Sequence, residues 1–292
     1  DKDLASVIKN RMIDISELSF SSVKLLKQSG LLLSKPIKGL DYFEQSYTVA
    51  NLPNRAILDL THECNCHCLT CYHRDDLDNY QPSLADLINR INKLKSFGVV
   101  NFEITGGEPL LRHDLIEILN YLINQRLNYF LVTNGEYLEE VNDDLIELLK
   151  KAIAVVISLD GVGDRHDLAR KRPGLYDKIL RGLRNLSQKN VRFAFIYTVQ
   201  EANVHDIPEA IELAYSMNAI IQLRPVKIVG SAEKNSLISP SYRKVVSWLN
   251  NPIVSNGFVG NQKRSFEARL YGCPILVEIA IDARGKIHPC VM

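Results

Sequence analysis

The feature that most constrains the fold is a regular alternation between residues 55 and 224. Short apolar runs of strand length alternate there with amphipathic stretches of helical period. The first of these helical stretches begins at Ser83, a favourable N-cap, and stops at Gly98. The alternation predicts a parallel sheet, either open and doubly wound or curled into a barrel, and the pattern alone does not decide between them. The expected strands are 56–61, 101–105, 129–133, 152–159, 191–199 and 219–224.

Both ends of the chain depart from this alternation. The N-terminal region contains two helix-like stretches, and the pattern weakens again after Arg224. Near the C-terminus, apolar segments flank an Ala-Arg-Gly sequence and predict a hairpin. We therefore expect three parts: an N-terminal extension over 1–54, an α/β body over 55–230, and a linker with a small additional segment over 231–292.

Charge and hydropathy exclude several classes of partner. The chain has 35 basic and 34 acidic residues, a net charge of +1, which argues against a dedicated nucleic-acid surface. No apolar run approaches the roughly 18–20 residues that a membrane-spanning helix needs. We expect neither nucleic acid nor a membrane as a partner.

The cysteines are clustered. Four of the six, Cys64, Cys66, Cys68 and Cys71, lie within eight residues, and the other two are near the C-terminus. Disulfides between such close neighbours would close no useful loop. The clustering therefore predicts metal binding in a reducing compartment, and the cytoplasm is the expected location.

The spacing Cys64-x3-Cys68-x2-Cys71 directly follows the first strand. A cubane iron–sulfur cluster needs closely spaced thiolates on one flexible loop, and three cysteines leave its fourth iron open to a substrate or cofactor. A structural zinc site is the alternative, although zinc sites usually pair two such knuckles and only one is present here. Spacing favours the cluster without excluding zinc, and it does not exclude Cys66 as a ligand. Further candidate zinc ligands are His62, His67 and His73.

Polar motifs also end the other predicted strands. Gly106-Gly107-Glu108 follows the second strand, where paired glycines allow close backbone approach to a ligand and the carboxylate can accept from an ammonium group. The alternative is a turn in which Glu108 only caps the next helix. The carboxyl ends of parallel strands meet at one edge, so we expect these motifs to surround one mouth with the cysteines. The remaining motifs are 133–135, 158–161, 197–198 and 224–225.

A locally basic run, 165–172, follows the fourth strand. Charge runs of this kind are usually solvated loops, and we expect this for most of its members. One arginine directed into the mouth would pair with a carboxylate or phosphate in bidentate geometry.

The ordered set of these motifs resembles the radical SAM (S-adenosylmethionine) superfamily over about residues 55–225. Within it, the chain is most similar to the SPASM/Twitch-containing subgroup that includes the molybdenum-cofactor cyclase and the anaerobic sulfatase-maturing enzymes. The resemblance implies a partial (β/α)6 TIM-like barrel, and it implies that Cys64, Cys68 and Cys71 ligate a catalytic 4Fe–4S cluster whose open iron chelates SAM.

The resemblance also implies a SAM-binding set. Gly106, Gly107 and Glu108 would hold the methionyl ammonium, and Leu223 would pack near adenine. The chain departs from the family at Thr70, where an aromatic residue is usual, so adenine contact would rest on backbone or shift to Tyr72. The rest of the implied set, which would hold the ribose and carboxylate side, is Thr133, Asn134, Ser158, Asp160 and Arg170.

A second resemblance lies at the C-terminus. Cys273, eleven residues, Gly285, four residues and Cys290 resemble the opening of a SPASM or Twitch domain. This implies an auxiliary iron–sulfur cluster with Cys273 and Cys290 among its ligands. Two cysteines cannot complete a cluster, and the alternative is two unrelated cysteines that flank a hairpin.

The activity that the resemblance implies is reductive cleavage of SAM to a 5′-deoxyadenosyl radical, with the electron delivered by a flavodoxin- or ferredoxin-type donor. The expected substrate is a ribosomal peptide or protein, whose leader the N-terminal extension would dock unless it simply covers the barrel. A small molecule such as a sugar, aminocyclitol or cofactor precursor is the alternative substrate. A more distant alternative is a non-catalytic iron–sulfur or zinc module, which Glu108→Ala would leave unaffected.

Overall fold

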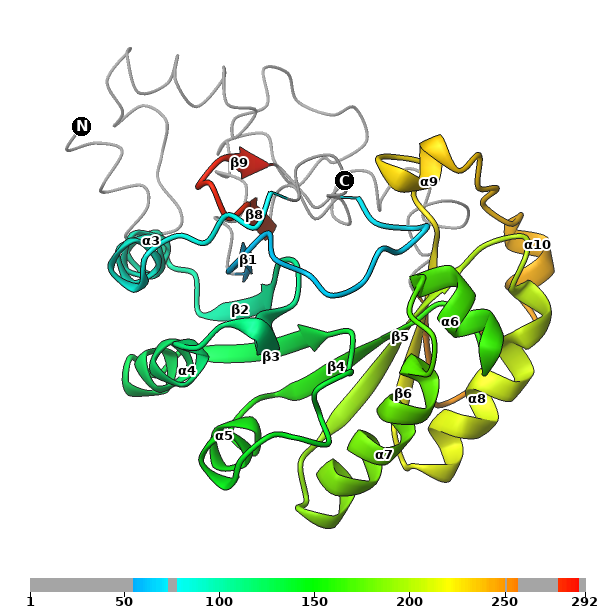
Figure 1. Cartoon of the computed structure of the whole chain (residues 1–292), viewed down its shortest axis with the longest axis horizontal. Coiled ribbons are helices and arrows are strands. Elements are labelled where there is room, and N and C mark those ends of the chain that lie inside the picture. The colour runs from blue at the N-terminus through cyan, green and yellow to red at the C-terminus, as the bar shows by residue number, and fades with distance from the viewer. Residues whose placement is uncertain (1–54, 73–77, 250, 257–277, 289–292) are drawn as a thin grey trace, which may run out of the picture.

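The computed structural model describes residues 55–72, 78–249, 251–256 and 278–288 (Figure 1). The N-terminal extension, Cys273 and Cys290 lie outside these residues. The described strands form one sheet in the order β7-β6-β5-β4-β3-β2-β1-β8-β9. Their bounds are β1 Arg55–Asp59, β2 Asn101–Thr105, β3 Asn128–Thr133, β4 Ala154–Leu159, β5 Phe193–Val199, β6 Ile220–Pro225, β7 Val254–Asn256, β8 Glu278–Ile281 and β9 Ile287–His288.

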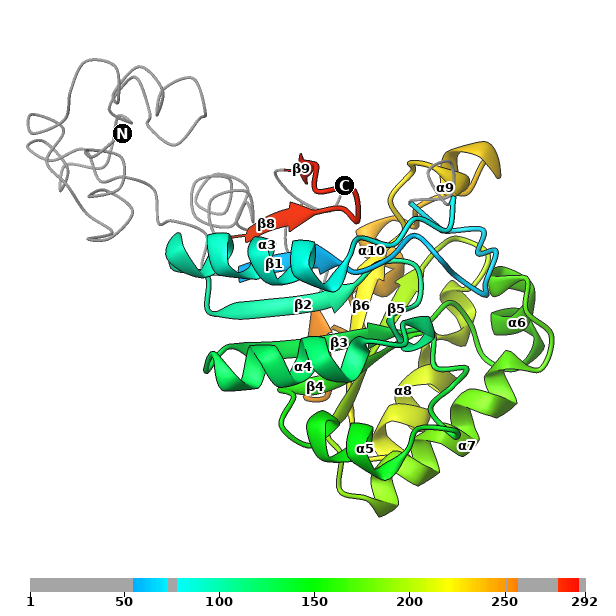
Figure 2. The ribbon, with the colours of Figure 1, turned by 60° about the vertical axis from the view of Figure 1, so that its left-hand side comes forward.

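Every strand pair from β7 to β8 is parallel, and only β9 is antiparallel to its neighbour. The sheet is curved, with the helices along its outer side (Figures 1 and 2). This confirms the expected unclosed, TIM-like α/β architecture.

The helices follow the predicted pattern. In α3, Leu87, Ile91 and Leu94 face the core, and the Ser83 hydroxyl caps the helix by accepting from the N–H of Asp86 at 3.1 Å. The other helical elements are η4 Pro109–Leu111, α4 Leu115–Asn124, α5 Asp143–Leu149, α6 Asp164–Arg170, α7 Leu175–Gln188, η5 Val204–Asp206, α8 Ile207–Ser216, α9 Ser231–Lys234 and α10 Tyr242–Val245; α3 spans Leu84–Ser96.

The two faces of the sheet differ in their packing partners. Alternate strand residues, such as Phe195, Tyr197 and Val199 of β5, are fully or almost fully buried in one hydrophobic cluster with residues of the helices. The intervening residues, such as Ile196 and Thr198, are only partly buried and belong to the concave inner side. The core therefore lies between the sheet and the helices.

Two features differ from or extend the expectations, and a third confirms one. The basic run 165–172 forms α6 and the turn after it instead of a solvated loop. The additional strands β7 and β8 extend the sheet beyond the six predicted strands. The predicted C-terminal hairpin is confirmed as β8 and β9. Within the described ranges, no helix combines the length and apolarity needed to cross a bilayer.

Candidate active site

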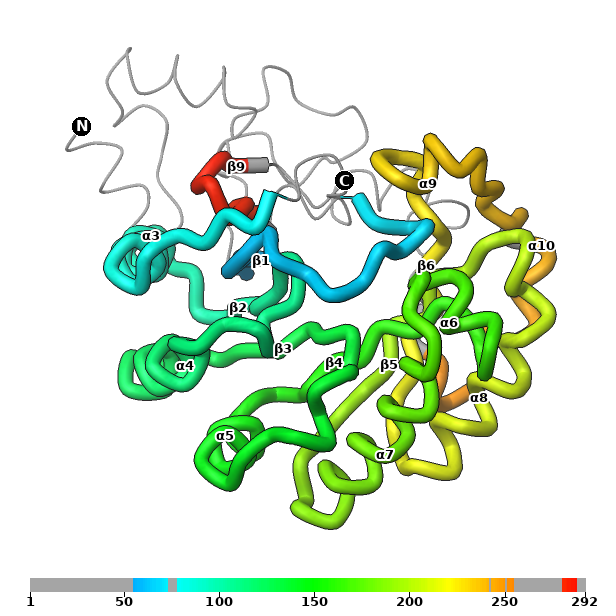
Figure 3. Tube along the Cα trace, viewed as in Figure 1, coloured from blue at the N-terminus to red at the C-terminus, as the bar shows by residue number. Residues whose placement is uncertain are grey.

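The cysteine loop, residues 61–72, leaves β1 and crosses the carboxyl edge of the sheet toward α6 and α9 (Figure 3). Its four cysteines are free thiols; Cys66 and Cys68 are buried, whereas Cys64 and Cys71 are half-buried. The loop is long and irregular, so its conformation depends on what it contacts.

The start of the loop runs backbone to backbone along the Gly106-Gly107 turn. The N–H of Gly107 donates to the carbonyl of Thr61 at 2.6 Å, and that of Glu108 donates to the carbonyl of Glu63 at 2.8 Å. A Cβ at Gly106, whose φ is +131°, would lie 2.5 Å from the Thr61 oxygen, and one at Gly107 would lie 2.0 Å from the Glu63 oxygen. Both glycines are therefore required by the approach of the cysteine loop itself.

The Glu108 carboxylate joins the ends of β2 and β3. It is fully buried and accepts from the Thr133 hydroxyl at 2.7 Å, from the N–H of Asn134 at 2.7 Å and from the N–H of Leu110 at 3.0 Å. Burial raises the pKa of Glu108, opposed by these hydrogen bonds. The capping alternative from the sequence is thus partly correct, because one of the three donors belongs to the helical turn after Glu108.

On the opposite side, an arginine paired with a buried aspartate reaches a cysteine sulfur. Arg170 Nε lies 2.8 Å from Asp160 Oδ2, and Arg170 Nη1 donates to Cys68 Sγ at 3.5 Å. The Thr70 hydroxyl donates to the same Asp160 oxygen at 3.1 Å. Burial lowers the pKa of Arg170, but the charges of Asp160 and Cys68 outweigh it and the net shift is upward.

The rest of the loop is held by backbone contacts with α6 and α9. The N–H groups of His67 and Leu69 donate to the last carbonyls of α6, and the N–H of Ser231 at the start of α9 donates to the carbonyl of Cys71 at 2.9 Å. The carbonyls at the end of α6 would otherwise lack partners within the helix. The loop is therefore tied to elements that follow β4 and β6.

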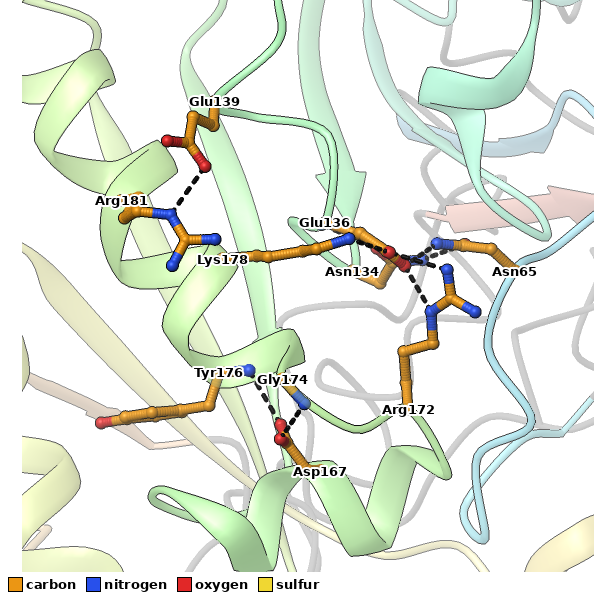
Figure 4. Close-up of polar contacts among 10 residues, drawn as sticks. All are labelled: Asn65, Asn134, Glu136, Glu139, Asp167, Arg172, Gly174, Tyr176, Lys178 and Arg181. Atoms are coloured by element: carbon orange, nitrogen blue, oxygen red, sulfur yellow. Dashed lines mark hydrogen bonds and ion pairs between the residues drawn. The ribbon is translucent and has the colours of Figure 1, made fainter.

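Asn65, between the first two cysteines, contacts the end of β3. Its side chain accepts from Asn134 Nδ2 at 2.7 Å and donates to Glu136, on which Arg172 and Lys178 converge (Figure 4). The cysteine loop thus contacts the turn after β2, the end of β3, and helices α6 and α9.

A family model for the radical SAM superfamily matches residues 58–214 of this chain. The chain belongs to the radical SAM superfamily. It is 29% identical over 161 residues to the Fe-coproporphyrin III synthase of Methanosarcina barkeri, covering 54% of this chain and 40% of that protein. It is also 29% identical over 165 residues to the subtilosin biosynthesis protein AlbA of Bacillus subtilis, covering 55% and 37%. The chain thus spans less than half the length of these two relatives.

The fold agrees with that of a solved radical SAM relative. Streptococcus suis SuiB, in complex with its precursor peptide SuiA, superposes with a TM-score of 0.69 at 15% identity, over 92% of this chain and 62% of that one. At this identity the likeness concerns the fold. Radical SAM proteins use a 4Fe–4S cluster and SAM, so the thiols and polar groups at the mouth can be tested against those cofactors.

The thiols fit an iron–sulfur cluster. The Cys66 thiol hydrogen-bonds with both Cys64 and Cys68. These hydrogen bonds lower the pKa of Cys64 and, together with the charge of Arg170, lower the pKa of Cys68 to about 7, although burial opposes both shifts. The same contacts raise the pKa of Cys66. A thiol whose pKa is lowered is more readily converted to the thiolate, the form that binds iron.

The other residues in the predicted SAM-binding set fall into two groups. The contacts above bring Thr133, Asn134 and Glu108 together on one side of the loop, and Thr70, Asp160 and Arg170 on the other. Ser158 lies on the inner side of β4 and is half-buried. Tyr72 is about a third exposed, with a side-chain hydrogen bond to Thr105. Leu223 is fully buried in the hydrophobic core.

Sequence reasoning missed the residues that position the loop. Arg112 is buried and donates to the carbonyls of Leu60 at 2.7 Å and Pro82 at 3.2 Å, so it joins both ends of the β1–α3 connection. Asn65 and Glu136 were also overlooked. The available signals were an amide residue next to the first cysteine and an acidic residue two positions after Asn134.

Proposed function

We propose that Cys64, Cys68 and Cys71 hold a 4Fe–4S cluster and that the surrounding mouth binds SAM for radical chemistry on a ribosomal peptide or protein. The observation that carries this proposal is that Arg170, paired with the buried Asp160, lies directly against Cys68 Sγ, at the same edge as the glycine turn. When bound and reduced, the cofactors supply an electron and an organic radical that removes a hydrogen atom from substrate.

The chain's own residues bind and orient. Arg170 stabilises the Cys68 thiolate and, with Asp160 and Thr70, fixes the loop after Cys68. Glu108 already has three protein donors, so its role is to hold the Gly106–Gly107 backbone and the end of β3 in place for SAM. Thr133 and Asn134 are part of that scaffold, and Ser158 offers a free inner-face hydroxyl position for the nucleoside side.

The substrate would lie against the inner face of the sheet. On this face, the middle strands of the sheet present partly buried apolar side chains such as Phe130, Val132 and Ile196, whereas β6 presents Gln222 and Arg224. A mixed apolar and cationic surface suits a peptide side chain with a nearby carboxylate or backbone carbonyl. AlbA, named for subtilosin biosynthesis, and SuiB with its precursor peptide also support a peptide substrate.

A small-molecule substrate is the second candidate. It is favoured by the similarity to Fe-coproporphyrin III synthase, which is named for a porphyrin. The apolar middle of the inner face suits such a substrate as well.

The remaining parts of the proposal concern the flanks of the barrel. We assign 1–54 to an extension, 55–230 to the SAM-binding barrel, and 231–292 to a linker and the start of a SPASM- or Twitch-like segment, in which Cys273 and Cys290 would ligate an auxiliary cluster. The free thiols of the cysteine loop suit a reducing compartment such as the cytoplasm, where a flavodoxin- or ferredoxin-type protein would supply the electron.

The test is anaerobic reconstitution with iron and sulfide, followed by reduction with dithionite in the presence of SAM. We expect iron binding that is lost in the Cys64→Ala/Cys68→Ala/Cys71→Ala variant, and release of 5′-deoxyadenosine and methionine measured by mass spectrometry. A wild-type preparation with an intact reduced cluster and no 5′-deoxyadenosine would contradict the proposal. Co-expression with a short peptide encoded beside the gene then separates the two substrate classes, because the mass of that peptide changes only if the peptide is the substrate.

A further inference from the structure

Both polar atoms of the Asn65 side-chain amide are hydrogen-bonded. Its Oδ1 accepts from Asn134 Nδ2 at 2.7 Å, and its Nδ2 donates to Glu136 Oε2 (Figure 4). An exposed loop asparagine needs no such pair of partners, because water satisfies both groups. The double anchor therefore fixes the orientation of the Asn65 side chain and of the peptide that follows it.

The partners of Asn65 are themselves immobilised. Asn134 donates its backbone N–H to Glu108 at 2.7 Å and accepts from the N–H of Glu136 through Oδ1 at 3.0 Å. The side chain of Glu136 is only 2% exposed. Asn134 and Glu136 therefore hold Asn65 from fixed positions just after β3, directly against the cysteine loop.

Two cations hold the buried Glu136 carboxylate. Arg172 binds it in bidentate fashion at 2.7 and 2.8 Å, and Lys178 contacts it at 2.6 Å. A carboxylate buried to this degree is tolerated only when it is paired. Burial raises the pKa of Glu136, but the hydrogen bonds from Arg172 and Lys178 outweigh it, so the net shift is downward and the group stays ionised.

Asp167 fixes the turn that carries Arg172. Its carboxylate accepts from the N–H groups of Gly174 at 2.5 Å and Tyr176 at 2.8 Å, at the beginning of α7 (Figure 4). It thereby supplies the helix cap that Gly174 cannot provide. Arg172 and Lys178 consequently reach Glu136 from a fixed position.

The peptide after Asn65 touches a cysteine that we assign to the cluster. The N–H of Cys66 donates to Cys64 Sγ at 3.5 Å. Hydrogen bonds to cluster sulfurs favour the more negatively charged, reduced state and so raise the reduction potential. The orientation of this N–H follows from the orientation of Asn65.

We propose that Asn65, Asn134, Glu136, Arg172 and Lys178 form a clamp that aims the Cys66 N–H at Cys64 Sγ and so sets the reduction potential of the cluster. These are positioning residues. The inference rests on the proposed ligation by Cys64, Cys68 and Cys71, and goes beyond it by naming what tunes the bound cluster.

The test is a redox titration of the reconstituted full chain, followed by electron paramagnetic resonance of the reduced cluster. Asn65→Ala should keep its iron but show a lower midpoint potential. We expect a tenfold lower ratio of reduced to oxidised clusters at a fixed potential, which corresponds to about 59 mV for a one-electron couple. Lys178→Met should shift the potential in the same direction by less, because Arg172 remains.

Matched controls lie on the same helix. Arg181, one turn beyond Lys178, pairs with Glu139 at 2.8 Å outside the clamp, so Arg181→Met should leave the potential unchanged (Figure 4). Lys178→Arg preserves the charge and should retain the wild-type potential. Should Asn65→Ala fail to load iron, the surface variants Lys178→Met and Arg172→Gln carry the same test.

Two negative results have different meanings. Iron-loaded Asn65→Ala with the wild-type potential, even with a lower unfolding temperature, overturns the clamp and leaves the proposed function intact. Wild-type protein that binds no cluster through the three cysteines overturns the proposed function, and this is seen before any clamp variant is measured.

Discussion

The two sides of the cysteine loop are held by carboxylates in contrasting settings. On the β4–α6 side, Asp160 is fully buried, the side chain of Arg170 is only 12% exposed, and the arginine touches Cys68 Sγ directly. On the β3 side, Glu136 is equally buried, but its cations Arg172 and Lys178 are about two fifths exposed and it reaches the loop through the neutral Asn65. The first arrangement should tolerate little change, whereas the second can be adjusted from the surface without loss of the fold.

The largest effect should come from Arg170→Met. It leaves the Asp160 carboxylate buried without a cation and removes a donor from Cys68, which should lower the free energy of unfolding of the apoprotein by about 3–5 kcal/mol. Anaerobic chemical denaturation measures this loss. Arg170→Lys keeps the charge and should recover part of it; equal losses in both variants would show that charge at this position is unimportant.

Glu108→Gln should have the next largest effect. A glutamine presents one NH2 group where the carboxylate accepts hydrogen bonds, so at least one of its three donors loses its partner, at about 1–3 kcal/mol. We expect a lower unfolding midpoint in the apoprotein, before SAM is added. A variant with normal apoprotein stability and weaker SAM binding, measured by calorimetry, would instead show that Glu108 contacts the ligand.

The β4–α6 side should also be sensitive to mild acid. Burial, followed by the charge of Arg170, lowers the pKa of His166 to about 3, and its Nδ1 accepts from the N–H of Asp160. Its folded pKa lies below the unfolded value of about 6.5, so its contribution is complete above that pH and is lost as pH falls toward 3. His166→Asn should flatten the stability profile below pH about 6.5 by up to about 1.4 kcal/mol per pH unit. An unchanged slope would count against a buried neutral imidazole.

The β3 side should respond to acid later and by less. The pKa of Glu136 is lowered because its hydrogen bonds to Arg172 and Lys178 outweigh the effect of burial. Its stabilising contribution is therefore present above the ordinary glutamate pKa of about 4.3 and is lost as pH falls through the depressed value. Unfolding temperatures of wild type and Glu136→Gln, followed from pH 7 downward, should converge only below pH about 4.3. Convergence near pH 6 would contradict this assignment.

Much of the barrel followed from local sequence pattern. The six predicted strands correspond to β1–β6 because strands buried in a parallel sheet leave continuous apolar runs between amphipathic helices. The pairing of β8 with β1 was not predictable, because it joins segments more than two hundred residues apart in the chain. The run 165–172 was misjudged in part because two of its arginines find partners far away in sequence, Asp206 for Arg165 and Glu136 for Arg172.

The candidate site was predictable in its location more than in its internal roles. Strand-end motifs had to meet at one edge, and they do. Whether a glycine faces a ligand or another backbone, and whether Asn134 serves SAM or Asn65, depends on side-chain contacts that a linear pattern does not encode. Arg112 illustrates the limit. Besides the nearby Asp114, its partners are the backbone carbonyls of Leu60 and Pro82, which any residue would supply.

The steric requirement for glycine at positions 106 and 107 has a consequence for the interpretation of related sequences. Because the cysteine loop cannot seat itself against any larger residue there, a descendant that had lost all chemistry but still folded would keep both glycines. The pair is thus a signature of ancestry and of a foldable chain. Inactive relatives should be sought among sequences that retain the glycines and have lost the thiols.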